Sequence, residues 1–491
     1  MARFYIENFG CRATQADGAA LERQFLERGL ERAGAARDAE IVVLNTCTVT
    51  EGADKDARAS IRRLQRVNPE CRILVTGCYA QRAPEELAAL PGVTWVVGNS
   101  HKHQAAEIAT SSLSSASAIS QVERISSKAG FVPLGQLSGD CLPRLDTERE
   151  SASHQAMVAV GDIFAHTELL AAPVFEAANE RTRPNLKVQD GCDNRCSFCV
   201  IPYVRGHSRS LSAERVIAEV QTLVAAGYRE VVISGINLGR WGRDLEGSSQ
   251  LSAVSCHSTS THVQRLEKLI RAILAQTSLE KLRISSVEPM DWSDELIGLV
   301  ASSSRIAKHA HVPMQSGSDA VLRRMHRKYR PWHYREKILK IRAAMPTAAI
   351  GADVMVGFPG ETEAEFDETR RMVEELPLTY LHVFTYSARP GTPAALLPQQ
   401  VPVTVARERN RVLREIATTK KTAFMRSLVG STVEAITLQT GGAESTEALT
   451  ENYLKVKLRG RHAANRWADV SVEGVDGEML LGERITMPEV A

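Results

Sequence analysis

The sequence contains no long hydrophobic run and little net charge. No apolar stretch approaches the roughly 18 residues that a membrane-spanning helix requires. The first residues also lack the basic and then apolar pattern of a secretory signal peptide. A net charge of +2 neither requires nor excludes a nucleic-acid partner, so any basic surface must be local. We therefore expect a cytoplasmic protein without a membrane partner.

The composition is ordinary for a soluble protein apart from its cysteines. Hydrophobic residues make up 43% and charged residues 24% of the 491 residues, a length that predicts about two to four domains. There are nine cysteines, an odd number without a secretory signal. Such cysteines indicate reduced thiols that bind metal rather than a disulfide framework.

Three cysteines form a C-x3-C-x2-C run, Cys192, Cys196 and Cys199, directly after a strand-like segment at residues 186–191. Three thiolates this close together can hold three corners of a cubane iron-sulfur cluster, and no fourth cysteine lies nearby. One iron would stay open and could chelate a cosubstrate. The alternatives are a zinc knuckle, which normally needs four ligands, and a chance cluster of inert cysteines.

Three further cysteines each follow a strand-like segment: Cys11, Cys47 and Cys78. The strand-like segments are residues 3–7, 41–45 and 72–76, and helical patterns alternate with them at residues 15–29 and 51–67. This alternation predicts a parallel α/β layer, in which ligands collect at the carboxyl ends of strands. We therefore expect these cysteines to converge on a second cluster, although each alone could be a buried apolar cysteine. Cys71 begins its strand, and we interpret it as structural.

With both cysteine sets, the sequence resembles the methylthiotransferases of the radical S-adenosylmethionine (SAM) superfamily. The N-terminal resemblance rests on N-F-G-C at residues 8–11, N-T-C-T-V-T at residues 45–50 and T-G-C-Y-A-Q at residues 76–81. The second of these runs, followed by Ala53 and Asp54, is most similar to the branch that acts on N6-threonylcarbamoyladenosine in tRNA.

The resemblance implies two 4Fe-4S clusters and SAM as cofactors. The cluster on Cys192, Cys196 and Cys199 would bind SAM and cleave it to a 5′-deoxyadenosyl radical. The cluster on the first three cysteines would supply sulfur, and a second SAM would supply the methyl group. The expected product carries a methylthio group on C2 of N6-threonylcarbamoyladenosine next to the anticodon. The expected partners are the tRNA anticodon stem-loop and a reductase such as flavodoxin or ferredoxin.

The fold class expected is α/β, with a flavodoxin-like parallel sheet domain, a central partial (β/α)6 barrel and a small C-terminal β-barrel. After residues 186–191, the expected barrel strands are residues 231–234, 282–285, 310–313, 351–356 and 381–385. The expected helices are residues 213–226, 263–276, 293–303, 319–326, 333–345 and 362–376. The chemistry of such barrels lies at the carboxyl ends of the strands.

The same reasoning divides the chain into five parts. They are an N-terminal methylthiotransferase domain with the auxiliary cluster (1–107), a Ser-rich insert and linker (108–180), a radical SAM domain with a second insert at 247–262 (181–403), a basic connecting helix (404–427) and a TRAM-like RNA-binding β-barrel (428–488). Residues 111–127 contain eight serines, which is a linker composition. Cys141 and Cys256 lie in the inserts, and we expect them to be incidental thiols.

Short Gly, Ser and Pro turns follow successive barrel strands, and by resemblance they line the SAM pocket. The cofactor-binding residues expected are Phe198, Gly235, Asn237, Ser285, Ser286, Glu288, Gln315, Ser316, Asp353 and Gly357. Each turn taken alone is equally typical of an ordinary loop between strand and helix. No side chain stands out as a catalytic acid or base.

Two basic segments near the end of the chain could face RNA. The first is an amphipathic helix with Arg407, Arg409, Arg411, Arg414, Lys420, Lys421 and Arg426. The second is a strand in which Tyr453, Lys455, Lys457, Arg459 and Arg461 alternate with apolar residues. The strand predicts a row of phosphate contacts on one face. A solvated helix face and an exposed strand kept soluble by cations are the alternatives.

Three other functions fit the same motifs. A related enzyme could methylthiolate isopentenyladenosine in tRNA or an aspartate of a ribosomal protein. A protein of another class, a non-catalytic iron-sulfur RNA-binding or redox-sensing protein, would retain the clusters without the chemistry. Iron near eight atoms per chain together with reductive SAM cleavage would favour the enzyme, because each cubane contains about four irons.

Overall fold

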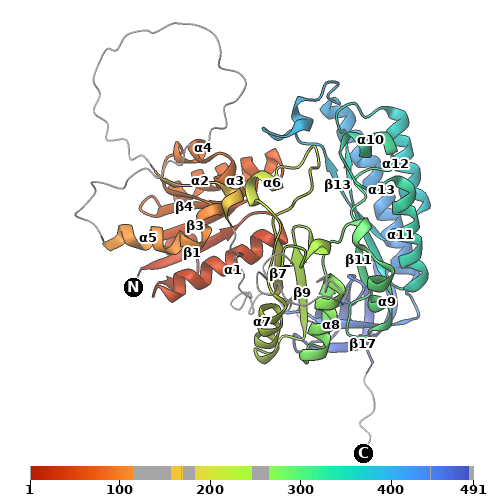
Figure 1. Ribbon diagram of the computed structural model, residues 1–491. Coiled ribbons are helices and arrows are strands. Elements are labelled where there is room, and N and C mark those ends of the chain that lie inside the picture. The colour runs from red at the N-terminus through yellow and green to blue at the C-terminus, as the bar shows by residue number, and fades with distance from the viewer. Residues whose placement is uncertain are drawn as a thin grey trace, which may run out of the picture.

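Figure 1 shows the computed structural model, which describes residues 2–114, 156–166, 169, 183–245, 265–442 and 444–485. Two parallel α/β units and a closed antiparallel-rich barrel follow one another along the chain. This arrangement confirms the predicted fold class. Cys141 and Cys256 lie outside the described residues. Within the described residues, no helix is long and apolar enough to span a membrane.

The N-terminal unit is a six-stranded parallel sheet with helices on both faces. Its strand order, β2-β1-β3-β4-β5-β6, begins with the 2-1-3-4-5 order of flavodoxin-like sheets. The strands are β1 (Arg3–Asn8), β2 (Glu31–Arg32), β3 (Ile41–Thr46), β4 (Arg72–Gly77), β5 (Val93–Gly98) and β6 (Met157–Ala159). The helices are α1 (Arg12–Glu27), α2 (Glu51–Val67), α3 (Cys78–Arg82), α4 (Pro84–Ala88) and α5 (Ala105–Ser114), with 3-10 turns η1 (Ala36–Asp38) and η2 (Asn99–Gln104).

Burial explains why these segments fold as they do. All six residues of β3 are buried, as expected of a central strand covered on both faces. Thr50 caps α2 by accepting a hydrogen bond from the Ala53 N–H at 3.2 Å. Apolar side chains of α1 and α5 cover one face of the sheet, and those of α2 cover the other.

The edge of this sheet was not predicted. β6 pairs in parallel with β5, although its residues fall in the range that we assigned to the linker. The linker prediction is therefore wrong for Met157–Ala159, because strand pairing rather than composition places this segment. α1 also begins three residues before the predicted start, directly after Cys11.

The central unit has the six predicted parallel strands in sequential order. They are β7 (Asn185–Asp190), β9 (Glu230–Gly235), β10 (Lys281–Ile284), β11 (His309–His311), β12 (Ala349–Val356) and β13 (Tyr380–Thr385), and β8 (Arg209–Ser210) runs antiparallel to β7. The strands form two sheets, and isolated bridges such as Ser286 to His311 join β10 to β11.

Helices cover the outside of this open barrel (Figure 1). They are α7 (Ala213–Ala225), α8 (Leu266–Gln276), α9 (Asp294–Ser302), α10 (Asp319–Arg324), α11 (Pro331–Ala344), α12 (Glu363–Glu375) and α13 (Val403–Ser427), whereas the short α6 (Ile201–Arg205) packs against α3 of the N-terminal unit. The 3-10 turns are η3 (Ile163–Ala165), η5 (Leu238–Arg240), η7 (Pro289–Asp291) and η8 (Pro393–Leu396). One continuous apolar core lies between these helices and the strands, and it includes the buried rings of Trp241 and Trp292.

The C-terminal unit is a closed barrel in the order β14-β15-β16-β18-β17. Its strands are β14 (Thr432–Thr437), β15 (Ser445–Thr450), β16 (Lys455–Arg459), β17 (Trp467–Asp476) and β18 (Met479–Arg484). The turn between β15 and β16 docks on the central unit. There the Glu451 carbonyl accepts from Arg283 at 2.9 Å, and the Asn452 amide donates to the Thr347 carbonyl at 3.1 Å.

Candidate active site

The C-x3-C-x2-C loop follows β7 and is held rigidly. Ser197 donates to the Arg324 carbonyl at 2.7 Å, and its own carbonyl accepts from the Ala394 N–H at 2.8 Å. The sulfurs of Cys192 and Cys196 face hydrogen-bond donors. Asn194 N–H lies 3.4 Å from the Cys192 sulfur, the Asn237 amide 3.7 Å from the same sulfur and Arg327 Nη1 3.3 Å from the Cys196 sulfur. Donors of this kind stabilise thiolates bound to a cluster.

The N-terminal cysteines converge at the carboxyl ends of their strands, as the sequence predicts. Cys11 precedes α1 and is exposed, whereas Cys47 after β3 and Cys78 at the start of α3 are buried. Gly10 has a φ of +103°, and a side-chain carbon there would lie only 2.6 Å from the Cys47 Cβ. Glycine is therefore needed for the approach of Cys11 to Cys47.

The electrostatics of both triads fit metal-bound thiolates. Burial, together with the Cys78 thiol beside it, raises the pKa of Cys47 to about 12. Burial and the neighbouring Cys196 thiol likewise raise the pKa of Cys199 to about 12. Clustered thiols of this kind repel one another as anions and become favourable as thiolates only when a metal supplies positive charge. The two donor sets thus suit iron-sulfur clusters.

The C-x3-C-x2-C triad and one member of the N-terminal triad, Cys11, line one cavity of about 600 Å³. Its lining includes Cys192, Cys196 and Cys199 from the central unit and Cys11 from the N-terminal unit. Eight of the ten expected cofactor-binding residues also line it: Phe198, Gly235, Asn237, Ser285, Ser286, Glu288, Gln315 and Asp353. The cavity therefore brings together residues that the sequence analysis selected from separate motifs.

Ser316 and Gly357 are the two expected residues absent from this lining. The buried Ser316 hydroxyl lies 3.1 Å from the Thr369 hydroxyl on α12. The Gly357 N–H donates to the Glu361 carboxylate at 2.6 Å, and a side chain there would contact Ala406 on α13. Both residues hold the strand-to-helix turns in place instead of facing the cavity.

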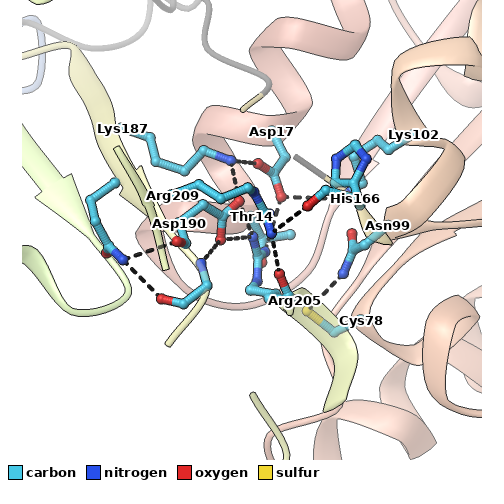
Figure 2. Close-up of polar contacts among 12 residues, drawn as sticks. Thr14, Asp17, Cys78, Asn99, Lys102, His166, Lys187, Asp190, Arg205 and Arg209 are labelled. Carbon is cyan, nitrogen blue, oxygen red and sulfur yellow. Dashed lines mark hydrogen bonds and ion pairs between the residues drawn. The ribbon is translucent and has the colours of Figure 1, made fainter. Parts of the chain in front are cut away.

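A buried ionic cluster joins the two units behind the cysteines (Figure 2). Asp17 of α1 lies between Lys102 and Lys187, and it also accepts from Arg205 of α6 at 2.9 Å. Asp190 at the end of β7 pairs with both Lys187 and Arg205. Although burial alone would raise it, these cations hold the pKa of Asp17 well below its usual range.

This ionic cluster adjoins the N-terminal triad. The Asn99 amide donates to the Val204 carbonyl on α6 at 2.7 Å and lies 3.5 Å from the Cys78 sulfur. Burial opposes the charge on Arg205, but Asp190 and the Cys78 thiol hold its pKa well above the usual range. The Arg205 guanidinium therefore stays positively charged beside Cys78, the first residue of α3.

The far end of the cavity contains aromatic and histidine side chains that the sequence analysis missed: His309, His311, Tyr380 and His382. They surround Asp353, which lies 3.4 Å from His311 and 3.3 Å from His382. Burial alone would raise the pKa of Asp353, but these two histidines hold it well below its usual range. The alternation His-Ala-His in β11 was the available signal, since it puts both histidines on one face.

Tyr453 corrects the predicted RNA-binding row. The residue adopts a φ of +67° in the turn before β16, so its side chain leaves the parity of the strand and lines the cavity. Lys455, Lys457 and Arg459 are exposed and alternate with buried neighbours, as predicted. Lys455 lies 3.5 Å from Glu447, and Arg459 lies 3.7 Å from Glu473. Arg461 follows the strand and is exposed.

Several cations of α13 hold the fold together instead of forming a free basic face. The buried Arg409 pairs with Glu361 at 2.8 Å and with Glu363 at 3.0 Å. Lys420 donates to the carbonyl groups that end α12, and Lys421 pairs with Glu478 of the barrel. Arg411 is bound between Glu408 and Glu415 on its own helix. For these four residues the contacts within the protein favour a structural or solvated role over the RNA-facing alternative.

Comparison with known proteins gives the same outline. Residues 3–98 match the family described as Uncharacterized protein family UPF0004, and residues 186–373 match the Radical SAM superfamily. The chain is 34% identical to the threonylcarbamoyladenosine tRNA methylthiotransferase MtaB of Bacillus subtilis, over 94% of this chain and 91% of that protein. The MtaB protein of Aquifex aeolicus is also 34% identical, over 93% of this chain and 96% of its own length.

A second group of relatives carries another name. The chain is 31% identical to the tRNA-2-methylthio-N(6)-dimethylallyladenosine synthase of Novosphingobium aromaticivorans, over 89% of this chain and 87% of that protein. Among solved structures, the radical SAM methyltransferase TsrM of Kitasatospora setae has a TM-score of 0.52 at 15% identity and covers 81% of this chain and 77% of that chain. The structural likeness concerns the fold alone. The two domain matches and the near full-length relatives establish that the chain belongs to the radical SAM methylthiotransferase family.

Proposed function

We propose that the protein adds a methylthio group to C2 of N6-threonylcarbamoyladenosine in tRNA. The observation that carries the proposal is the single cavity lined by Cys11 on one side and by Cys192, Cys196 and Cys199 on the other. Formation of a carbon-sulfur bond at an unactivated ring carbon needs both a radical source and a sulfur source at the same atom. Side chains supply neither, so cofactors must do so.

The two cysteine sets are suited to hold one 4Fe-4S cluster each. When bound, the clusters would supply the electron that cleaves SAM at the C-x3-C-x2-C loop and the sulfur at Cys11, Cys47 and Cys78. The chain itself binds and orients the reactants. Asn237, Ser285 and Glu288 line the SAM side of the cavity, where hydroxyl, amide and carboxylate groups suit ribose hydroxyls and an ammonium group.

Glu288 is positioned by Arg327, whose second nitrogen approaches the Cys196 sulfur. Arg327 therefore links the carboxylate that faces SAM to the cysteine loop. The guanidinium is buried, and it would offset negative charge on a thiolate more strongly than a cation in bulk water. These residues position the cosubstrate without themselves taking part in proton transfer.

The choice of substrate follows two relatives that are each 34% identical to this chain and are named for threonylcarbamoyladenosine. The experiment that tests it is nucleoside mass spectrometry of tRNA from cells with and without this protein. A methylthio group on N6-threonylcarbamoyladenosine that requires the protein supports the proposal. Its appearance on isopentenyladenosine instead would assign to this chain the activity for which the second group of relatives is named. A methylthiolated ribosomal protein with unchanged tRNA would reject a tRNA substrate.

Iron content and SAM cleavage separate the enzyme from a non-catalytic iron-sulfur protein. We expect about eight irons per chain and reductive cleavage of SAM. A single cluster without cleavage would instead indicate an RNA-binding or redox-sensing protein. The reductant we propose is a flavodoxin or a ferredoxin in the cytoplasm, and it can be tested by replacing dithionite with each protein in the cleavage assay.

A further inference from the structure

Three arginines from separate parts of the chain surround the ring of Tyr453. Arg12 begins α1, Arg183 precedes β7 and Arg283 lies in β10. Their guanidinium carbons lie 5.9, 5.9 and 5.5 Å from the centre of the ring. Tyr453 and Arg12 both line the cavity, so this cluster forms part of its wall.

The carboxylates nearby do not balance these charges. Glu230 accepts from Arg283 at 2.5 Å and lies 3.8 Å from Arg183. Glu451 and Glu434 pair with Lys281, and Asp353 is bound by two histidines. Within the part of the chain that the structure describes, Arg12 has no carboxylate partner. Its side chain instead donates to the Tyr453 hydroxyl at 3.2 Å.

The surroundings make this unbalanced charge costly. His309 is buried, and burial together with the nearby Arg283 holds its pKa well below the usual range, so the ring is neutral. The rings of His309 and Tyr380 lie 5.0 and 6.1 Å from the ring of Tyr453. A cation beside apolar rings is stabilised by an incoming anion more strongly than a cation in bulk water.

We propose that Arg12 binds the carboxylate of the threonyl group on the substrate base, with Tyr453 and Tyr380 against the base or its side chain. This inference rests on the proposed function. The threonylcarbamoyl group ends in a carboxylate, whereas the isopentenyl group is neutral and apolar. Arg12 follows Cys11 directly, so the contact also holds the base next to the N-terminal cysteine triad. Arg12 is thereby a specificity-determining residue for the acidic substrate.

The test uses the cluster-loaded protein and two anticodon stem-loop oligonucleotides under anaerobic conditions. One carries N6-threonylcarbamoyladenosine and the other carries its methyl ester, which has the same shape without the charge. We expect the wild-type protein to bind the acid at least about tenfold more tightly than the ester, as a charge-assisted hydrogen bond allows. Arg12→Gln should bind both hairpins with the wild-type affinity for the ester. Arg12→Lys should recover part of the preference, because it keeps the charge but not the planar fork.

The control is Arg62→Gln, on the exposed face of α2, which should keep the wild-type preference. Equal weakening of both hairpins by Arg12→Gln would show a contact to backbone phosphate and overturn the proposal. If Arg12→Gln loses its clusters, Tyr453→Phe decides: a reduced preference for the acid supports the proposal, and an unchanged preference rejects it. A wild-type protein that methylthiolates the acid hairpin yet binds acid and ester equally would reject the carboxylate site and leave the function intact. Preference for an isopentenyladenosine hairpin would reject the proposed function itself.

Discussion

Arg205 of α6 donates to Asp17 of α1 at 2.9 Å, across 188 positions of the sequence, and both side chains are fully buried. This pair connects the N-terminal unit to the central unit directly behind the cysteine triad that contains Cys78. A buried ion pair of this kind adds little to the free energy of unfolding. When every charge has a partner, it instead favours one arrangement of the two units over others. We infer that it fixes the relative position of the two cysteine sets.

Loss of the Asp17 carboxylate should therefore lower the free energy of unfolding substantially. Asp17→Asn removes the carboxylate that pairs with Lys102 and leaves Lys187 and Arg205 with Asp190 alone, and breaking such a network costs about 3–5 kcal/mol. Denaturation followed by intrinsic fluorescence measures the change. Asp367→Asn, which removes a half-exposed pair with Arg370, is the matched control and should cost at most about 1 kcal/mol. A similar small loss for both variants would contradict the role of the cluster.

The same cluster predicts how stability depends on pH. The pKa of Asp17 and that of Asp190 are lowered in the folded protein, so both carboxylates stabilise it above their unfolded pKa of about 3.9. This contribution is lost as the pH falls from about 4 toward the lower folded values. The difference in stability between wild type and Asp17→Asn should be constant from about pH 8 to pH 5 and shrink below pH 4. A difference that grew on acidification would have the wrong sign.

The two cysteine sets should separate functionally, because they are suited to different clusters. Cys196→Ala should abolish SAM cleavage. Cys47→Ala should leave SAM cleavage and stop formation of the methylthio product. Product analysis, with iron content measured on the same samples, checks both variants. If a folded Cys47→Ala protein also loses cleavage, the proposed division between the sites is wrong.

The exposed face of β16 gives a prediction about RNA. Replacing Lys455, Lys457 and Arg459 by Glu should weaken tRNA binding and reduce the slope of log affinity against log salt, by about 0.9 for each phosphate that is no longer neutralised. SAM cleavage should not change, because none of the three lines the cavity. The matched control removes the carboxylates beside these cations: Glu447→Gln with Glu473→Gln should strengthen binding. Unchanged binding in both variants would place the RNA elsewhere.

Gly351 offers a way to narrow the far end of the cavity. Gly351 lies opposite Tyr380 in the β12–β13 pair, and an added Cβ would collide with the Tyr380 ring. Gly351→Ala should cost about 1–3 kcal/mol of stability and lower product formation at least tenfold, while SAM cleavage stays near the wild-type level. Gly298→Ala on α9 is the control, because nothing lies within 4 Å of its added Cβ. Equal product from both variants would show that Tyr380 does not contact the substrate.

The elements that could be predicted from sequence are those with a local signal. The C-x3-C-x2-C run, the cysteines after β1, β3 and β4, and the six strands of the central unit each follow from short patterns. β6 could not be predicted, because a three-residue edge strand is defined by its pairing with β5 rather than by its own composition.

The site residues that were missed depend on tertiary contacts. Tyr453 fits the period-two row of β16, but its positive φ turns the side chain into the cavity, and single-residue backbone geometry leaves no periodic trace. Arg409 looks like a surface cation of a basic helix, yet Glu361 lies across from it on another element. The role proposed for Arg12 depends on its contact with Tyr453, which lies 441 positions later in the chain.

That separation also has a consequence for synthesis of the protein. All six cysteines that we propose as cluster ligands are in place by Cys199, whereas Tyr453 is added much later. At about 5–20 residues per second, the ribosome adds Tyr453 more than roughly 20 s after Arg12. A nascent chain therefore carries every proposed cluster ligand before the β-barrel can complete the wall of the cavity. Delivery of iron only after release from the ribosome would prevent radical chemistry in a cavity whose wall is still incomplete.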